Sequence, residues 1–304
     1  MASKFLSVCL NPTIQKTCLF SSLELNEVNR TMEYYTDASG KGINVSRVLM
    51  QLGADVCHLT HLGQNARAFL QLAAKDNIAI EWEDSGSEIR SCSTLLDRSV
   101  NTATEIVEES LPVGEGTSER ILKTYRRIIY NYDWIIISGT KAAGYPDTIF
   151  PDMVALAREL GKKVILDYRG KDLIDSLPLG PQYAKPNIRE FVQTFLKNKV
   201  DEKSINSTES QKMIKRTMID IYRHYKTIMI VTQGPDPVLF YDDGKIKKIQ
   251  PDAITPVNPT GSGDAFTAGL AFSLSKGETL KNAVNEGIRC GALNAKLIRP
   301  GVLR

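Results

Sequence analysis

Short apolar runs that alternate with amphipathic stretches are the feature that most constrains the fold of this chain. The runs at 133–138 and 227–232 are almost wholly apolar, which is typical of strands buried on both faces. Further strands are expected at 5–10, 55–62 and 162–167. Between them, residues 42–53 and 146–163 show helical periodicity and include a glycine, Gly53 or Gly161, that can end a helix. This alternation predicts an α/β fold with a mainly parallel sheet covered by helices.

Two segments, about 11–38 and 87–112, depart from that rhythm. Both alternate like strands and contain no long helical stretch. Within the second, RSCSTLLD and TATEIVEE read as a hairpin around RSVN. These segments predict a small second sheet that projects from the main body. Because no low-complexity linker or internal repeat interrupts the sequence, residues 1–304 are expected to form a single domain that carries this sheet.

Composition excludes several classes of protein. The 304 residues are 42% hydrophobic and 24% charged, as in an ordinary globular chain, and the net charge of +3 is too small to favour nucleic acid. No run is long and apolar enough to suggest a membrane span. The five cysteines are scattered and odd in number, and the N-terminal apolar stretch is too short for a signal peptide. A reduced, cytoplasmic location is therefore expected.

The stretch NPTGSGDAFTAG, at 258–269, carries the clearest chemistry. A glycine-rich turn that opens a helix exposes backbone N–H groups and attracts anions. Asp264 follows the turn directly and would repel a resting phosphate. An acid is useful there if it removes a proton from a hydroxyl that attacks a phosphoryl group. The alternatives from the residues alone are that the turn is only a turn and that Asp264 is a helix N-cap.

This stretch resembles the C-terminal signature of the PfkB, or ribokinase-like, carbohydrate kinases. SGKGINVSRVLMQLG is similar to the family's N-terminal signature. The segments LNPTIQKT, EVNR, IRSCSTLLD, TEIVEESLP, SGTKAAGYP, KPNIREF and VTQGPDPVLF follow in the order seen in the 1-phosphofructokinase and tagatose-6-phosphate kinase branch. The resemblance covers essentially the whole chain. It implies a ribokinase-like three-layer α/β/α sandwich with a small β-sheet lid, the lid being the segments at 11–38 and 87–112.

The resemblance also implies an activity, transfer of the γ-phosphate of ATP to a sugar hydroxyl with Mg²⁺. At matching positions Asp264 would be the catalytic base, and the anion hole would comprise Gly261, Ser262 and Gly263. Asn187 and Glu190 match a motif that organises the phosphates and a hydrated magnesium ion, Glu190 acting through water. The nucleotide side would include Thr232, Gly234, Gly261, Gly263 and Asn294. Helix capping is the alternative for Asn187 and Glu190.

At the sugar end, the resemblance implies a substrate that already carries a phosphate, as in fructose 1-phosphate, tagatose 6-phosphate or fructose 6-phosphate. Its phosphate would be held by Arg30, Lys41, Arg90 and Ser138, and its hydroxyls would contact Gln15, Gly42 and Asn44. The branch usually has an acid at Gln15, which is expected in the loop after the first strand, and a glycine at Ser39, and Lys141 replaces an apolar residue. Pro235 and Pro237 remove backbone donors beside the nucleotide. These departures affect specificity rather than the base.

Two other functions stay open, a kinase of an unphosphorylated sugar or nucleoside, and a kinase-like protein that binds ligands without turnover. A metal site at His58 and His61 is disfavoured because strand spacing puts the two side chains on opposite faces. The chain also lacks a dinucleotide-binding G-x-G-x-x-G after a strand. Since exposed strand edges often pair between subunits, we expect a homodimer through the lid.

Overall fold

The computed structural model describes residues 3–304. Within them, a nine-stranded sheet has the order β13-β12-β11-β10-β9-β8-β1-β4-β5. Neighbours from β11 to β5 run parallel, whereas β12 and β13 add an antiparallel edge. The strands are β1 (Lys4–Cys9), β4 (Asp55–Gln64), β5 (Ala79–Glu88), β8 (Trp134–Ser138), β9 (Lys163–Asp167), β10 (Tyr183–Ala184), β11 (Ile228–Gln233), β12 (Asp236–Asp242) and β13 (Lys245–Ile249).

Helices cover both faces of this sheet, because its strands are apolar on both sides. Ile135 and Ile137 of β8 pack in one core cluster, and Ile136 packs in another. The first cluster includes residues of α3 (Thr117–Ile128), α4 (Ile149–Glu159), α5 (Lys171–Ser176), α6 (Ile188–Phe195) and α7 (Thr208–Tyr225). The opposite face is covered by α1 (Lys41–Gln51), α8 (Ser262–Ser275) and α9 (Leu280–Ala295). The result is the expected three-layer α/β/α sandwich.

The remaining elements complete the outline of the chain. Helix α2 (Ala66–Ala74) packs with the start of α1 and the base of the second sheet. Three short 3₁₀ helices are η1 (Ile129–Asn131), η2 (Leu177–Leu179) and η3 (Glu202–Ser204). No helix in residues 3–304 combines the length and the apolar character that crossing a membrane requires.

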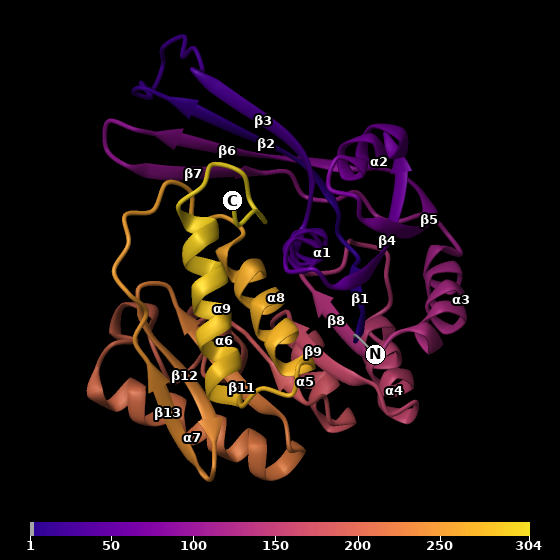
Figure 1. Cartoon of the computed structure of the whole chain (residues 1–304), viewed down its shortest axis with the longest axis vertical. Coiled ribbons are helices and arrows are strands. Elements are labelled where there is room, and N and C mark those ends of the chain that lie inside the picture. Colours follow the sequence, from indigo (N-terminus) through magenta and orange to yellow (C-terminus); the bar gives the residue numbers. More distant parts are fainter. Residues whose placement is uncertain (1–2) are drawn as a thin grey trace.

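The smaller sheet, which we call the lid, has the order β3-β2-β6-β7. Its strands are β2 (Thr13–Phe20), β3 (Glu33–Ser39), β6 (Arg90–Asp97) and β7 (Thr102–Val107). Strands β6 and β7 form the expected antiparallel hairpin, and every residue of β7 is exposed. Figure 1 shows the lid extending across the ends of α8 and α9, with the C-terminus beneath it. The lid therefore covers the end of the molecule where α8 begins.

The structure confirms the strands and helices expected from apolar periodicity, and it corrects one detail. Gln15, which the sequence placed in the loop after the first strand, lies inside β2. Strands β5, β10, β12 and β13 were not anticipated. β5 and β13 are mostly exposed or half-buried and β10 has only two residues, so none of these three has the continuous apolar run of a central strand, whereas β12 does contain a buried apolar run at 238–240.

Candidate active site

A cavity of about 350 Å³ lies between the body and the lid, close to the start of α8. The sheet contributes through the carboxyl ends of its parallel strands, where ligands of open α/β sheets bind. Residues that are far apart in sequence meet there: Gln15, Lys41, Asn44, Arg90, Asn187, Glu190, Thr232, Gly261, Gly263 and Asp264. Ten of the predicted site residues therefore share one cavity.

Asp264 is brought to this cavity by the first turn of α8. The N-cap of α8 is Gly261, in a left-handed conformation with φ of 82°. A Cβ at Gly261 would lie 2.9 Å from Cβ of Pro300, so both the backbone and the packing require glycine. Asp264 is only 6% exposed, and its Oδ2 accepts a 2.8 Å hydrogen bond from Nδ2 of Asn44. Asp264 is thus not the N-cap of α8, and its carboxylate is directed across the site.

The environment of Asp264 suits a general base. Burial raises the pKa of its carboxyl to about 7, with the positive charge of Lys41 opposing that rise and the negative charge of Asp167 adding to it. A base works best when its pKa lies near the working pH. The N–H groups at the start of α8 lie beside this carboxylate and can hold developing negative charge.

Lys41 lies at the centre of a buried charge cluster. Its Nζ is 3.1 Å from Oδ1 of Asp167 and 3.2 Å from Oε1 of Glu190. Burial alone would lower the pKa of Lys41, but these carboxylates and Asp264 raise it above its ordinary value. Lys185, which is 2% exposed, pairs with Oδ2 of Asp167 at 3.3 Å. Burial opposes the charge of Asp167, yet Lys185 and Lys41 hold its pKa below the ordinary value. Lys41 therefore stays charged beside the base.

Asn187 and Glu190 form the start of α6. The side chain of Asn187 accepts from the Glu190 N–H, and Oε2 of Glu190 accepts from the Asn187 N–H at 2.9 Å, which is a complete capping box. The alternative prediction, that Asn187 and Glu190 cap a helix, is therefore confirmed. The box leaves Oε1 of Glu190 directed at Lys41, so the same residues also line the cavity.

A larger cavity of about 870 Å³ adjoins the first, and Asn187, Thr232, Thr260 and Glu105 line both. Gly234 lies in its wall, and its predicted place beside the nucleotide stays a prediction. A residue of the lid, Glu105, bridges to the body because its Oε1 accepts a 2.8 Å hydrogen bond from Thr260 Oγ1. The two cavities are thus adjoining spaces around the start of α8.

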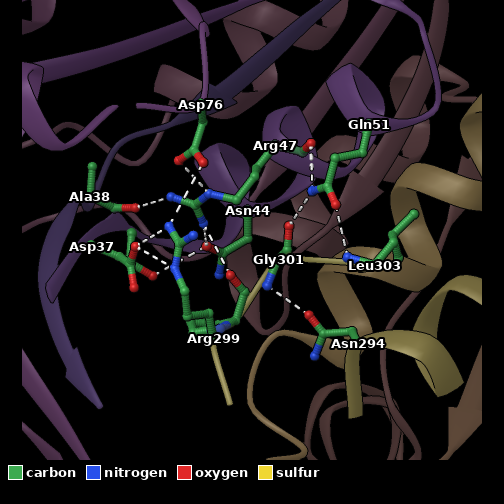
Figure 2. Close-up of polar contacts among 12 residues, drawn as sticks. Asp37, Ala38, Asn44, Arg47, Gln51, Asp76, Asn294, Arg299, Gly301 and Leu303 are labelled. Atoms are coloured by element: carbon green, nitrogen blue, oxygen red, sulfur yellow. Dashed lines mark hydrogen bonds and ion pairs between the residues drawn. The ribbon is translucent and has the colours of Figure 1, made fainter. Parts of the chain in front are cut away.

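Asn294 lies behind this wall rather than in it. The side chain is fully buried, and its Nδ2 donates to the Thr260 carbonyl at 2.9 Å. Figure 2 shows its Oδ1 accepting from the Gly301 N–H, at 2.6 Å. Asn294 therefore ties the glycine-rich turn to the C-terminal segment, and its predicted place near adenine stays a prediction.

A third cavity, of about 240 Å³, lies where the strand order reverses between β1 and β8. Its wall holds three cationic side chains, Lys41, Arg90 and Arg169. Among residues 3–304, Nε of Arg90 is a buried donor with no hydrogen-bond partner. Oγ of Ser138 is also buried without a partner, but Ser138 lines none of the three cavities, so its contact with a phosphate stays a prediction. Fork-shaped guanidinium groups and unused donors suit a phosphate group. Arg30 lies in the exposed turn between β2 and β3 and lines none of the three cavities, so its role stays a prediction.

Sequence reasoning missed three residues that line these cavities, Lys185, Arg169 and Glu105, and a fully buried residue behind them, Asp167, which pairs with Lys41 and Lys185. Asp167 could have been found, because it ends the predicted strand at 162–167, where a carboxylate faces the ligand edge of the sheet. Two residues at which the sequence departs from the family branch, Lys141 and Ser39, bond to other side chains of the protein. Lys141 pairs with Asp172, and the Ser39 hydroxyl donates to Asn44 Oδ1 at 3.2 Å.

The two histidines are internal packing groups. Nδ1 of His58 bonds the Ser7 hydroxyl at 2.7 Å, and Nδ1 of His61 bonds the Tyr145 hydroxyl at 2.9 Å. Burial lowers the pKa of His58 to about 3 and that of His61 to about 4, so both rings are neutral. The two rings thus bond different partners, Ser7 and Tyr145.

The fold and the site together define a class. A buried acid at a helix N-terminus, between a cation-lined cavity and a larger one, is an arrangement for transferring a phosphoryl group to a hydroxyl. Residues 11–298 match the family described as pfkB family carbohydrate kinase. The chain belongs to this family, and it is a sugar kinase, a phosphotransferase with an alcohol group as acceptor. Membership implies ATP as the phosphoryl donor.

Solved structures with the same fold include a phosphofructokinase and a protein described as a possible one. Phosphofructokinase-2 from Escherichia coli, in complex with potassium, has a TM-score of 0.83 and 17% identity, covering 97% of this chain and 93% of that one. A Thermotoga maritima protein described as a possible 1-phosphofructokinase has a TM-score of 0.86 and 20% identity, with the same coverage. At these identities the likeness concerns the fold, and it confirms the ribokinase-like architecture.

Proposed function

We propose that this protein transfers the γ-phosphate of ATP to a hydroxyl of a sugar that already carries a phosphate, of the fructose 1-phosphate, tagatose 6-phosphate or fructose 6-phosphate type. The observation that carries the proposal is the third cavity, where Arg90, Lys41 and Arg169 share a small wall next to the proposed base. Three cations and one carboxylate, Glu190, line about 240 Å³, and their net positive charge suits a phosphate better than neutral hydroxyls. A phosphofructokinase-2 of this fold has been solved with fructose 6-phosphate.

In this proposal Asp264 removes the proton of the acceptor hydroxyl as its oxygen attacks the γ-phosphorus. The bond to the ADP oxygen breaks, and the proton resides on the Asp264 carboxyl until solvent takes it. N–H groups of Gly263 and its neighbours at the start of α8 hold the charge that develops on the phosphoryl oxygens. Lys41, charged and held by Asp167 and Glu190, adds a fixed positive charge beside them.

Glu190 is the residue that would meet Mg²⁺. Its two carboxylate oxygens already bond Lys41 and the Asn187 N–H, at 3.2 and 2.9 Å. Contact through a water molecule would keep both bonds, which fits an ion that rarely sheds its water. When bound, Mg²⁺ would neutralise charge on the phosphates.

A screen of ATP consumption across sugars and sugar phosphates tests this function, with Asp264→Asn as the matched inactive protein. Turnover that is confined to sugar phosphates and lost in the variant supports it. Turnover of an unphosphorylated sugar or a nucleoside alone would contradict the phosphate assignment. If binding is seen without ATP consumption for every compound, the protein is a kinase-like binder instead.

We also propose that two copies of this chain pair through their lids. Seven of the thirteen exposed large apolar side chains of residues 3–304 lie there: Leu25, Val28, Met32, Tyr34, Val100, Ile106 and Val107. Analytical ultracentrifugation of Leu25→Lys and Ile106→Lys should show monomers. Ile174→Lys, which changes an exposed apolar residue of α5, is the control and should leave a dimer. A monomeric wild type would contradict the proposal.

A cytoplasmic location is proposed on the thiols. All five cysteines are free and buried, as is usual in a reducing compartment. Fractionation of cells that express the tagged full-length chain tests it.

A further inference from the structure

Arg47, on helix α1, is buried next to the proposed active site but does not line its cavities. Arg47 is 1% exposed and lies one turn after Asn44. Figure 2 shows its guanidinium surrounded by acceptors. Nε donates to Oδ2 of Asp76 at 2.7 Å, and Nη2 donates to the Ala38 carbonyl at 2.5 Å. Nη1 donates to Oδ1 of Asn44 at 2.9 Å and to the Pro300 carbonyl at 3.2 Å.

These contacts decide which way the Asn44 amide points. A guanidinium can only donate hydrogen bonds, so the group that faces Arg47 must be the amide oxygen. The Ser39 hydroxyl donates to the same oxygen at 3.2 Å. The amide nitrogen is thereby turned to Asp264, where it donates at 2.8 Å to Oδ2. If the amide rotated by half a turn, its oxygen would face the carboxylate, and two acceptors would repel each other.

We propose that Arg47 is a positioning residue for the phosphoryl-transfer reaction: by holding the oxygen of Asn44, it keeps an N–H donor on the carboxylate of Asp264. The proposal rests on the role of Asp264 given above. Arg47 itself contacts neither the charged residues that line the cavities nor the space that a substrate would occupy. Its hydrogen-bond partners are Asp76, Asn44 and two backbone carbonyls.

Arg47 also fastens the C-terminal segment, so a purely structural role has to be separated from the positioning role. Gln51, one turn further along α1, provides the control. Its Nε2 donates to the Gly301 carbonyl at 3.0 Å, and its Oε1 accepts from the Leu303 N–H at 2.9 Å. Gln51 therefore holds the same segment as Arg47 without a contact to Asn44. The variant Gln51→Ala loosens that segment and leaves the amide in place.

The readout is the ionisation of Asp264. The charged groups that face this carboxyl are Lys41 from α1, Asp167 from β9 and Lys185 beyond β10. Within the described residues, Arg47 makes no hydrogen bond to any of these three groups. Their effect on the pKa of Asp264 should therefore be unchanged when Arg47 is replaced. Loss of the Asn44 N–H removes a donor that favours the charged carboxylate, and the pKa of Asp264 should then rise by about one unit.

The experiment measures kcat from pH 5.5 to 9.5 for wild type, Arg47→Lys, Arg47→Met and Gln51→Ala, with the sugar phosphate that the screen identifies. Arg47→Lys keeps a buried charge opposite Asp76 and is expected to fold, but one ammonium cannot hold all four acceptors. In the pH profile of this variant, the acid limb, where kcat falls as pH falls, should move up by about one pH unit. The value of kcat should then be about fivefold lower than wild type at pH 7 and near wild type at pH 9.5. Gln51→Ala should lower the melting temperature and keep the wild-type limb.

A double-mutant cycle identifies the route of the effect. If Arg47 acts through Asn44, then Arg47→Lys in an Asn44→Ala background should shift the limb no further. The proposal is overturned if folded Arg47→Lys keeps the wild-type limb, or if Gln51→Ala shifts the limb as much. Should Arg47→Met not fold, the Lys variant still decides. Failure of the base assignment would show separately, as an Asp264→Asn variant with normal turnover.

Discussion

The amide of Asn44 and the carboxylate of Asp264, 220 residues apart in sequence, are joined by a 2.8 Å hydrogen bond at the centre of the site. One belongs to the N-terminal glycine-rich motif and the other to the C-terminal one. Each sits near the start of a buried helix, α1 or α8, on the same face of the main sheet. The two motifs therefore act on one carboxyl group, and most of the testable consequences concern its charge.

Catalysis should depend on pH through Asp264. Because burial raises the pKa of this carboxyl to about 7, the ionised form is lost as pH falls through that value. We expect kcat to fall about tenfold for each pH unit below 6 and to level off above pH 8. Asp264→Asn should lower kcat by roughly 10²-fold or more and leave no acid limb, while ATP still binds. A limb that persists unchanged in Asp264→Asn would assign it to another group.

Asp264 should also destabilise the folded protein at neutral pH. The folded-state pKa lies above the unfolded value, so the folded state binds more protons between about pH 4 and pH 7, and stability falls as pH rises through that window. Asp264→Asn removes this penalty and should raise the free energy of unfolding by up to roughly 4 kcal/mol at pH 8. Urea unfolding at pH 8 and pH 4 tests it, because the gain should shrink toward zero at the lower pH.

The phosphate assignment gives a binding prediction. Each charge-assisted hydrogen bond is worth about 1.5–3 kcal/mol, so Arg90→Ala should weaken sugar-phosphate binding about tenfold or more and leave the ATP constant nearly unchanged. Lys141→Met is the control, since Lys141 pairs with Asp172 and lines none of the three cavities. The assignment is wrong if Arg90→Ala loses ATP affinity and keeps sugar affinity. Isothermal titration with each ligand separates the outcomes.

Periodicity and local motifs were enough to predict a mainly parallel sheet covered by helices, a small second sheet and the helix opened by Gly261, and the resemblance to the kinase family added the three layers and the lid. What they could not predict depends on contacts between distant segments. Lys185 shows the reason, since it is an ordinary lysine in sequence and becomes a site residue only because β10 ends beside Asp167 of β9. Asn294 shows the converse, because its motif position suggests a ligand while the packing of Gly301 engages its side chain from behind.

The function of Arg30 could not be predicted from the sequence or the fold of one chain. Its position in the exposed turn between β2 and β3 follows from lid geometry that the sequence predicted, but its function depends on what that turn meets. An Arg30→Ala variant with unchanged sugar-phosphate affinity would remove it from the phosphate set. A loss comparable to that of Arg90→Ala would retain it.

Specificity should depend on Gln15. The side chain is 6% exposed on β2, and its Nε2 donates at 2.9 Å to Oγ1 of Thr94 on the neighbouring β6. Both residues line the cavity that holds Asp264. Nε2 also makes a long hydrogen bond of 3.5 Å to the Lys16 carbonyl, so Gln15 presents chiefly a neutral carbonyl oxygen and a weakly held N–H, whereas an acid would present acceptors only. Buried polar partners discriminate strongly between ligands that pair and ligands that do not.

We therefore expect wild type to prefer a sugar phosphate that differs, near this position, from fructose 1-phosphate and tagatose 6-phosphate, and that offers an acceptor or lacks a donor there. A panel of ketose and aldose phosphates is measured as kcat/KM on wild type, Gln15→Asp and Gln15→Glu. Gln15→Glu keeps the length and adds only charge, so it separates charge from reach, and Gln15→Asp should restore preference for the ketose phosphates. If wild type already turns over a standard ketose phosphate efficiently, and neither variant changes the substrate ranking, then Gln15 binds the same hydroxyls as the acid and does not set specificity.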